Sequence, residues 1–447
     1  MKKAAGHISV IIKEILCIGF SIRIILGIIW MCFNFTHLQE FQQTEGILYR
    51  CLKNLLGGNY GLLYAFQLAT AYYAADRFLQ KIRPTNLFWR IWGNLVLLTF
   101  PMAMQCHLAV SPYSLVSSFL LLELSAAIAV VREKDGNMVR EYVLAGFCWL
   151  ILALLLPEYF VLGAIPLLLV LLIRLPALLK RRSSLANCVL VFLAFGGMIV
   201  GIHGLTGEAD YLPDRESISY SLFSRTVWPT IWHDSAQWPA EVKAAVDGSV
   251  WEVSLYTDNM QKIFRPLMQE SFGHEQASEY YLQMAAASLK KHTVTVIRQI
   301  GGDVLGYSVT PLILPIQLRG EAYASYSGRN YEMMFIQAPL VTKYYVNYSC
   351  WWFGVMLVLT ALLFVMKQAE HLTKPRRSGV WAFLLCLITA GTMVTAYTLR
   401  GAGVMDYKCT VAVNLLWPAA ALLLMGKKDT LSSGEGENSE EAERERI

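Results

Sequence analysis

The sequence predicts an all-α, polytopic integral membrane protein with about ten transmembrane helices and a mostly helical extracytoplasmic domain. Of the 447 residues, 55% are hydrophobic and only 16% are charged, and the mean hydropathy is +0.42. Soluble domains contain about 25% charged residues, so this chain has too little polar surface to face water. Its apolar residues also gather into runs of membrane-spanning length, and basic residues alternate between the segments that join these runs.

The same composition argues against a soluble enzyme, a disordered regulator and a nucleic-acid binder. The formal charge of +5 is typical of cytoplasmic loops in a membrane protein, so we expect no nucleic-acid partner. Most of the nine cysteines lie in or beside apolar runs, residues 206–349 contain none, and no C-x-x-C occurs. They therefore behave as small apolar residues rather than as disulfide or zinc ligands.

A spanning helix needs roughly 20 mostly apolar residues. Met1-Lys2-Lys3 precedes a long apolar run without a small-residue cleavage site, so we interpret the first run as a retained helix. A single helix through the fifth and sixth runs would be about 50 Å long, so Pro157-Glu158 predicts a tight hairpin. The ten candidate spans are 15–34, 59–76, 92–109, 114–131, 142–156, 159–174, 185–205, 351–366, 379–398 and 410–425.

Basic residues orient these spans with both termini in the cytoplasm. The short outer loops hold few cations, namely Arg50, Lys53, Arg400 and Lys408. The inner segments hold many: Lys2, Lys3, Lys81, Arg83, Arg90, Arg132, Lys134, Arg140, Lys180, Arg181, Arg182, Lys374, Arg376, Arg377, Lys427 and Lys428.

The spans divide the chain into four parts. Residues 1–205 form an N-terminal membrane module of about seven spans, and residues 206–349 form the extracytoplasmic domain. Residues 350–426 form a C-terminal module of about three spans, and residues 427–447 form a charged, disordered cytoplasmic tail. Apolar residues at helical spacing also predict a helix along the outer interface over residues 45–56, which ends at Gly57-Gly58.

Two charges lie inside the apolar runs, away from the ends of the runs, at positions where burial is costly. Arg23 lies in the first run and Glu123 in the fourth. One hypothesis is an Arg23–Glu123 ion pair that joins the two helices. The alternative is that Arg23 extends to the cytoplasmic headgroups and that Glu123 is protonated or bonded to a neighbour.

Acidic residues of the outer face are candidates for proton transfer. A carboxylate beside the outer leaflet could take a proton from an acceptor hydroxyl. Glu40 and Glu45 are the only acids of the first outer loop, and Glu158 is a third acid at this level. The alternative for Glu40 and Glu45 is a solvated loop position, or a place for Glu45 in the first turn of the interfacial helix, where the helix dipole favours an acid.

Candidate substrate ligands come from other outer segments. Arg225 is surrounded by aromatic and turn residues, and its guanidinium could hold a phosphate through two oxygens; its rivals are Arg265, Arg298, Arg319 and Arg329. Gln105 and His107 end the third span and could bond a sugar hydroxyl, although a histidine at a helix end is more often satisfied by backbone groups. Neither a phosphate-binding loop nor a zinc-protease motif occurs, which argues against an ATP-driven pump and a zinc protease.

The layout resembles the bacterial C-type (GT-C) glycosyltransferases, which use polyprenyl-phosphate sugars. The likeness covers the inside N-terminus, the acidic first outer loop with its interfacial helix, the short hairpin and the outer domain. Further segments similar to those of related membrane proteins are 100–107, 111–114, 156–159 and 224–229.

The resemblance implies a fold of this family and a membrane glycosyltransferase of cell-envelope polysaccharide synthesis. It implies that Glu40 or Glu45, in place of the family's aspartate, is the catalytic base, and that Arg225, His107, Gln105 and Glu158 bind the donor. A carboxylate is absent between His107 and Ser114, so we expect no metal cofactor. Two alternatives stay open: a non-catalytic scaffold of envelope-polysaccharide assembly, and a lipid or polysaccharide transporter or flippase.

Overall fold

A computed structural model shows how these runs fold. It describes residues 2–34, 46–82, 87–107, 110–132, 139–180, 182–206, 215–227, 238–246, 263–309, 340–371, 378–400 and 411–425. Within these ranges the chain is almost entirely helical and forms no strand, which confirms the all-α prediction for the described part. The tail over 427–447 lies outside it.

Four described helical stretches are long and apolar enough to cross a membrane: His7–Cys32, Tyr113–Val131, Ala186–Thr206 and Lys343–Met366. Four shorter apolar helices accompany them, namely Leu87–Leu98, Tyr159–Leu175, Trp381–Ala396 and Leu415–Met425. The chain is thus compatible with membrane insertion, and the full count of ten spans and the orientation of the termini stay predictions.

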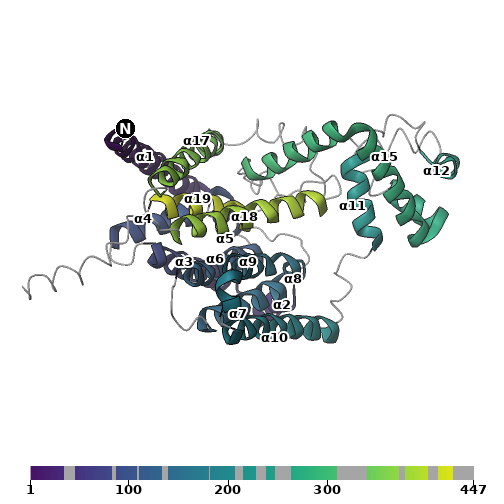
Figure 1. The fold of residues 1–447 in the computed structure, drawn as a ribbon, viewed down its shortest axis with the longest axis horizontal. Helices are drawn as coiled ribbons and strands as arrows, with labels where there is room; N and C mark the ends of the chain where they lie inside the picture. Colours follow the sequence, from purple (N-terminus) through teal and green to yellow (C-terminus); the bar gives the residue numbers. More distant parts are fainter. Residues whose placement is uncertain are drawn as a thin grey trace, which may run out of the picture.

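Helix α6 is the centre of the helical bundle (Figure 1). It packs against α3, α7, α9, α18 and α19, and its side chains are almost all buried. The bundle helices are α1 (Lys2–Asn34), α3 (Tyr60–Ile82), α4 (Leu87–Leu98), α5 (Pro101–His107), α6 (Tyr113–Arg132), α7 (Val139–Leu155), α8 (Tyr159–Leu162), α9 (Ala164–Lys180), α10 (Arg182–Thr206), α17 (Leu340–His371), α18 (Ser378–Arg400) and α19 (Val411–Met425). One apolar core includes Leu16, Leu120 and Leu422, so the first and last parts of the chain share it.

The break at Pro157-Glu158 divides the fifth apolar run from the sixth, as the sequence predicts. Helix α7 ends at Leu155, the one-turn helix α8 follows, and α9 packs against α7. The indole Nε1 of Trp149 donates to the carbonyl of Phe160 at 2.9 Å and so ties the two sides of the turn together. These contacts support a hairpin rather than one long helix.

The third run, expected as one helix over 92–109, is broken, and this corrects the prediction. Helix α4 ends at Leu98 and α5 begins at Pro101. A proline has no backbone N–H to donate to the carbonyl four residues earlier, here that of Leu97. The N–H of Phe100 donates to this carbonyl instead, at 3.3 Å. The regular helical ladder therefore stops at this point.

A second, separate apolar core lies in the segment between the two groups of bundle helices. It is formed by α11 (Arg215–Val227), α12 (Ala240–Ala245) and α15 (Arg265–Val309). The described stretch around α12 runs over residues 238–246. Its buried residues are Tyr220, Phe223, Val227, Trp238, Val242, Val246, Phe264, Met268, Ala277, Tyr280, Tyr281 and Met284. The helical content expected here is confirmed for the described residues, and its extracytoplasmic location stays a prediction.

An ion pair joins α11 to α15 beside this core. The guanidinium of Arg265 donates to both carboxylate oxygens of Glu216, through Nε at 3.0 Å, and also to the hydroxyl of Ser217 at 3.0 Å. Its charge lies 4.9 Å from the ring centroid of Tyr220. The hydrogen bond that Arg265 donates to the Glu216 carboxylate raises the pKa of Arg265 above its usual value, which means that the pair stabilises the charged guanidinium.

We predict that Glu216→Ala lowers the stability of this segment. The change leaves the half-buried Arg265 without its carboxylate and should reduce the free energy of unfolding by about 1–3 kcal/mol. The measurement is the thermal unfolding midpoint of the purified chain. Glu279→Ala is the matched control, because Glu279 is exposed on α15; equal midpoints for the two variants would contradict the prediction.

Candidate functional site

Helix α2 (Ile47–Leu55) is the amphipathic helix expected over 45–56. Tyr49 is fully buried on one face, and Leu48 and Leu52 pack against the bundle core on the same side. The helix ends before Gly57 and Gly58, which have φ angles of 60° and 72°, a backbone region that favours glycine. The predicted helix and its stop signal are therefore both present, and its position at a membrane surface stays a prediction.

Gly46 fixes the start of α2 against the turn between α7 and α8. Its N–H donates to the carbonyl of Leu155 at 2.9 Å. A Cβ atom at this position would lie 2.3 Å from the carbonyl oxygen of Leu154 and 2.6 Å from that of Leu155, far inside contact distance. Only glycine fits here without movement of the backbone. The chain therefore enters α2 directly beside the turn that holds the half-buried Glu158.

One helical turn further on, α2 reaches a buried chain of hydrogen bonds. The hydroxyl of Tyr49 donates to Oε1 of Gln67 on α3 at 3.0 Å. The amide Nε2 of Gln67 donates in turn to the carbonyl of His107, at the end of α5, at 3.3 Å. Buried polar groups need such partners, because an unpaired one costs about 1–3 kcal/mol. These bonds align α2, α3 and α5 with one another.

The His107 side chain is buried and bonded to α6. Its Nδ1 lies 2.7 Å from the hydroxyl of Ser114, and the hydroxyls of Ser117 and Ser118 donate to the carbonyl of Ser114 at 2.9 and 2.8 Å. A cavity of about 10 Å³, roughly the space of one water molecule, is lined by His107, Ser117 and Ser118, with apolar residues around it. The imidazole Nδ1 can accept or donate the hydrogen bond to Ser114, depending on its tautomer, but the cavity is too small for a sugar.

The break between α4 and α5 is closed by side chains from distant helices. The guanidinium of Arg23, on α1, donates to the carbonyls of Val96 and Thr99, the latter at 3.1 Å. The hydroxyl of Tyr345, on α17, donates to the same carbonyl of Thr99 at 2.9 Å. Arg23 is only 1% exposed, and a cation at the C-terminal end of a helix is favoured by the helix dipole.

Of the two hypotheses for the charges inside the apolar runs, the Arg23–Glu123 ion pair is wrong. Arg23 bonds carbonyls of the broken helix instead, and both carboxylate oxygens of Glu123 are buried without a hydrogen-bond partner among the described residues. Arg23 also does not extend to the headgroups, because its guanidinium lies over the ring of Phe100 at 5.0 Å. Sequence alone gives the charge of Arg23, but the freed carbonyls that attract it appear only in the fold.

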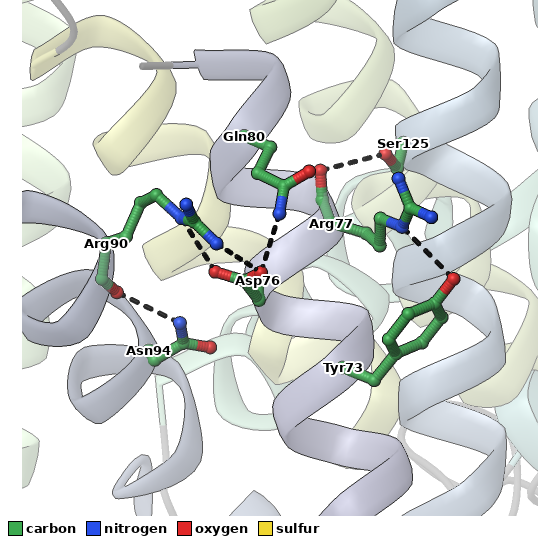
Figure 2. A network of polar contacts seen from close by, with 7 residues as sticks. All are labelled: Tyr73, Asp76, Arg77, Gln80, Arg90, Asn94 and Ser125. Atoms are coloured by element: carbon green, nitrogen blue, oxygen red, sulfur yellow. Dashed lines mark hydrogen bonds and ion pairs between the residues drawn. The ribbon is translucent and has the colours of Figure 1, made fainter. Parts of the chain in front are cut away.

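A second polar network joins α3 to α4 further along α3 (Figure 2). Asp76 accepts two hydrogen bonds from Arg90, at 2.8 and 2.6 Å, and one from Gln80 at 2.7 Å. Ser125 of α6 donates to the carbonyl of Arg77 at 3.4 Å. Asp76 lies nine residues after Gln67 in α3, about 13 Å along the axis, so this network fixes helix packing away from the candidate site.

The structure brings some of the predicted site residues together. The Glu158 turn and the backbone of His107 are joined through α2, by way of Gly46 and Tyr49. Glu40 and Glu45 lie outside the described residues. Gln105 is in α5 and Arg225 in α11, and their side chains also lie outside the described part.

Sequence reasoning missed the residues that connect the site. Gln67 lies between two apolar residues in the middle of the expected second span, and an amide at such a position was a usable signal. Ser114, Ser117 and Ser118 are spaced for one helical face. Tyr49 gave no polar signal, because its hydroxyl lies on the apolar face of α2.

Comparisons with known proteins leave the family open. No protein-family model, curated protein or solved structure matches the chain. In the described part of the chain, no group of three or more histidine, cysteine, aspartate or glutamate residues is arranged to hold a metal ion.

We predict that Gly46→Ala disrupts the docking of α2. The added Cβ atom must displace backbone carbonyl oxygens, so the thermal midpoint and the yield of folded protein should both fall. Gly197→Ala is the matched control, because a Cβ atom there meets nothing within 4 Å and alanine favours a helix by about 1 kcal/mol. A Gly46→Ala protein as stable as the control would contradict the close contact.

We predict that Arg23→Met destabilises the broken helix by about 2–5 kcal/mol, because it leaves buried carbonyls short of donors. Arg77→Met is the control, since the Arg77 side chain is exposed and its guanidinium donates to Tyr73 of the same helix. The readout is thermal unfolding in detergent. The double variant Arg23→Glu with Glu123→Arg should not restore stability; rescue by this exchange would instead support an ion pair.

Proposed function

We propose that the chain is a membrane glycosyltransferase of the C-type architecture, which moves a sugar from a polyprenyl-phosphate donor to an acceptor at the outer face of the cell membrane. The proposal combines the resemblance in layout with the geometry around α2. The proposed donor is a polyprenyl-linked glycosyl phosphate, and the proposed acceptor carries a hydroxyl group.

The observation that carries the proposal is the docking of Gly46 against Leu155. It anchors the end of the acid-bearing loop to the turn that holds Glu158. The same helix continues to Tyr49 and to the network of His107. The Glu158 turn and the backbone of His107 are thus both joined to α2, which supports a site at one end of the bundle, beside one membrane leaflet.

In the proposed reaction the acceptor hydroxyl attacks the anomeric carbon of the donor sugar. The new carbon–oxygen bond forms as the bond to the phosphate oxygen breaks, and polyprenyl phosphate leaves. Glu40 or Glu45 takes the hydroxyl proton as general base, and Arg225 offsets the growing negative charge on the phosphate. His107 has a positioning role, because its ring is bonded to Ser114 and it borders a cavity of only about 10 Å³.

A second candidate function is a lipid transporter or flippase. The break between α4 and α5 favours it, because interrupted helices deep in the bundle are typical of transporters. Glu123 adds a buried carboxyl group without a partner in the described residues, and such groups mark ion or substrate paths in many membrane proteins. The absence of internal sequence repeats favours the enzyme over this alternative.

We predict that Glu40→Gln with Glu45→Gln lowers sugar transfer by about 10²-fold or more, since a lost general base costs about 10²–10⁴-fold. The assay uses native membranes with a panel of radiolabelled undecaprenyl-phosphate hexoses and follows the release of label from the lipid. Glu270→Gln with Glu275→Gln is the matched control, because both glutamates are exposed on α15.

The outcomes separate the candidate functions. If the wild-type chain transfers sugar and the Glu40 and Glu45 variant transfers it equally well, the proposed general base is overturned. Thermal stabilisation by undecaprenyl phosphate without sugar release, combined with movement of the lipid between leaflets in vesicles, would replace the enzyme with a flippase. If the chain shows neither sugar transfer nor thermal stabilisation, the non-catalytic scaffold is the remaining function.

A further inference from the structure

The second half of α15 differs from the rest of the segment that contains it. The helix is interrupted first at Gly273, where φ is 73°, and again at His292, where φ is −124° and ψ is 33°; the kink at His292 divides its two halves. Just before the kink, the hydroxyl of Ser288 donates to the carbonyl of Thr226 on α11 at 2.6 Å. The first half therefore belongs to the core with α11, and the kink directs residues 293–309 away from it.

Beyond the kink, apolar side chains face outward. Val294 is 80% exposed and Ile297 is 63% exposed, whereas Val296 between them is fully buried. Positions 294 and 297 are three residues apart and share one face of the helix. Removing such side chains from water would contribute about 1.5–3 kcal/mol each, so this face has a driving force to be covered.

The same surface is positively charged. Lys290, Lys291 and Arg298 are exposed around the two apolar residues. Residues 280–302 contain no aspartate or glutamate, so this stretch contributes positive charge only. A helix with exposed apolar residues beside basic ones is typical of segments that lie in the interface of an anionic membrane.

The position of α15 in the fold agrees with a membrane contact. The helix contacts α17 and α18, and α17 includes the candidate span Lys343–Met366. Figure 1 shows the second half of α15 running back toward these helices, whereas its first half and α12 point away from the bundle. The exposed face therefore lies near helices that are apolar enough to enter the bilayer.

We propose that residues 289–298 of α15 form a docking surface for anionic phospholipid headgroups, here called the basic face. Val294 and Ile297 enter the headgroup region, and Lys290 and Arg298 bind the phosphates. Charge complementarity selects anionic lipid over a neutral bilayer. The basic face would hold the outer segment against the membrane, and this role does not depend on sugar transfer.

The test places a nitrobenzoxadiazole-bearing amino acid at position 294 in the full chain, reconstituted in nanodiscs. Discs of pure phosphatidylcholine are compared with discs that contain phosphatidylglycerol. We expect a blue-shifted emission and strong quenching by headgroup spin-labelled lipid in the anionic discs. The same probe at position 275, on the first half of α15, serves as the control and should report water in both discs.

The charge dependence is tested with Lys290→Gln and Arg298→Gln together. Loss of two cations should lower the ratio of docked to undocked protein by about 30-fold, and raised salt should have a similar effect. Both side chains are exposed, so the thermal midpoint should stay at the wild-type value. A water-like emission at position 294 in both discs, or a blue shift equal in detergent and in lipid, would overturn the proposal.

Discussion

The satisfaction of buried backbone groups is the constraint on which this fold depends. Inside an apolar bundle, each unpaired carbonyl or N–H costs free energy, because no water is present to replace the missing hydrogen-bond partner. Pro101 stops the α4 ladder, and at this break the carbonyls of Val96 and Thr99 accept from side chains of other helices. Arg23 and Tyr345 supply them from α1 and α17. One helix break therefore ties together the beginning, the middle and the later part of the chain.

The candidate site uses the same principle at a different place. Gly46 gives its N–H to the carbonyl of Leu155 at the end of α7, and Gln67 bonds the carbonyl of His107 at the end of α5. Helix ends expose such carbonyls, and α2 and α3 satisfy them. Bonds to backbone carbonyls at helix ends thus help to hold the elements that carry candidate chemistry.

Local patterns in the sequence predicted much of the fold. Hydrophobic periodicity gave α2 with its glycine stop, and Pro157 gave the division between α7 and α8, because both features depend on neighbouring residues. Pro101 carried the same information about the third span, but its place inside an apolar run hid it. The partners of Arg23 could not be predicted, because they are backbone carbonyls, which every residue has and which no sequence pattern marks. The bond between Gln67 and His107 required the packing of three helices.

Hydrogen–deuterium exchange of α5 tests the central claim most directly. The amides of Ala103, Met104 and His107 should be protected in the wild-type chain, because Arg23 and Tyr345 hold the start of this helix. In Arg23→Met they should exchange several-fold faster, while the amides of α10, which has no bond to the break, keep their protection. Unchanged exchange in α5 would contradict the account, since the break would then be stable without the guanidinium.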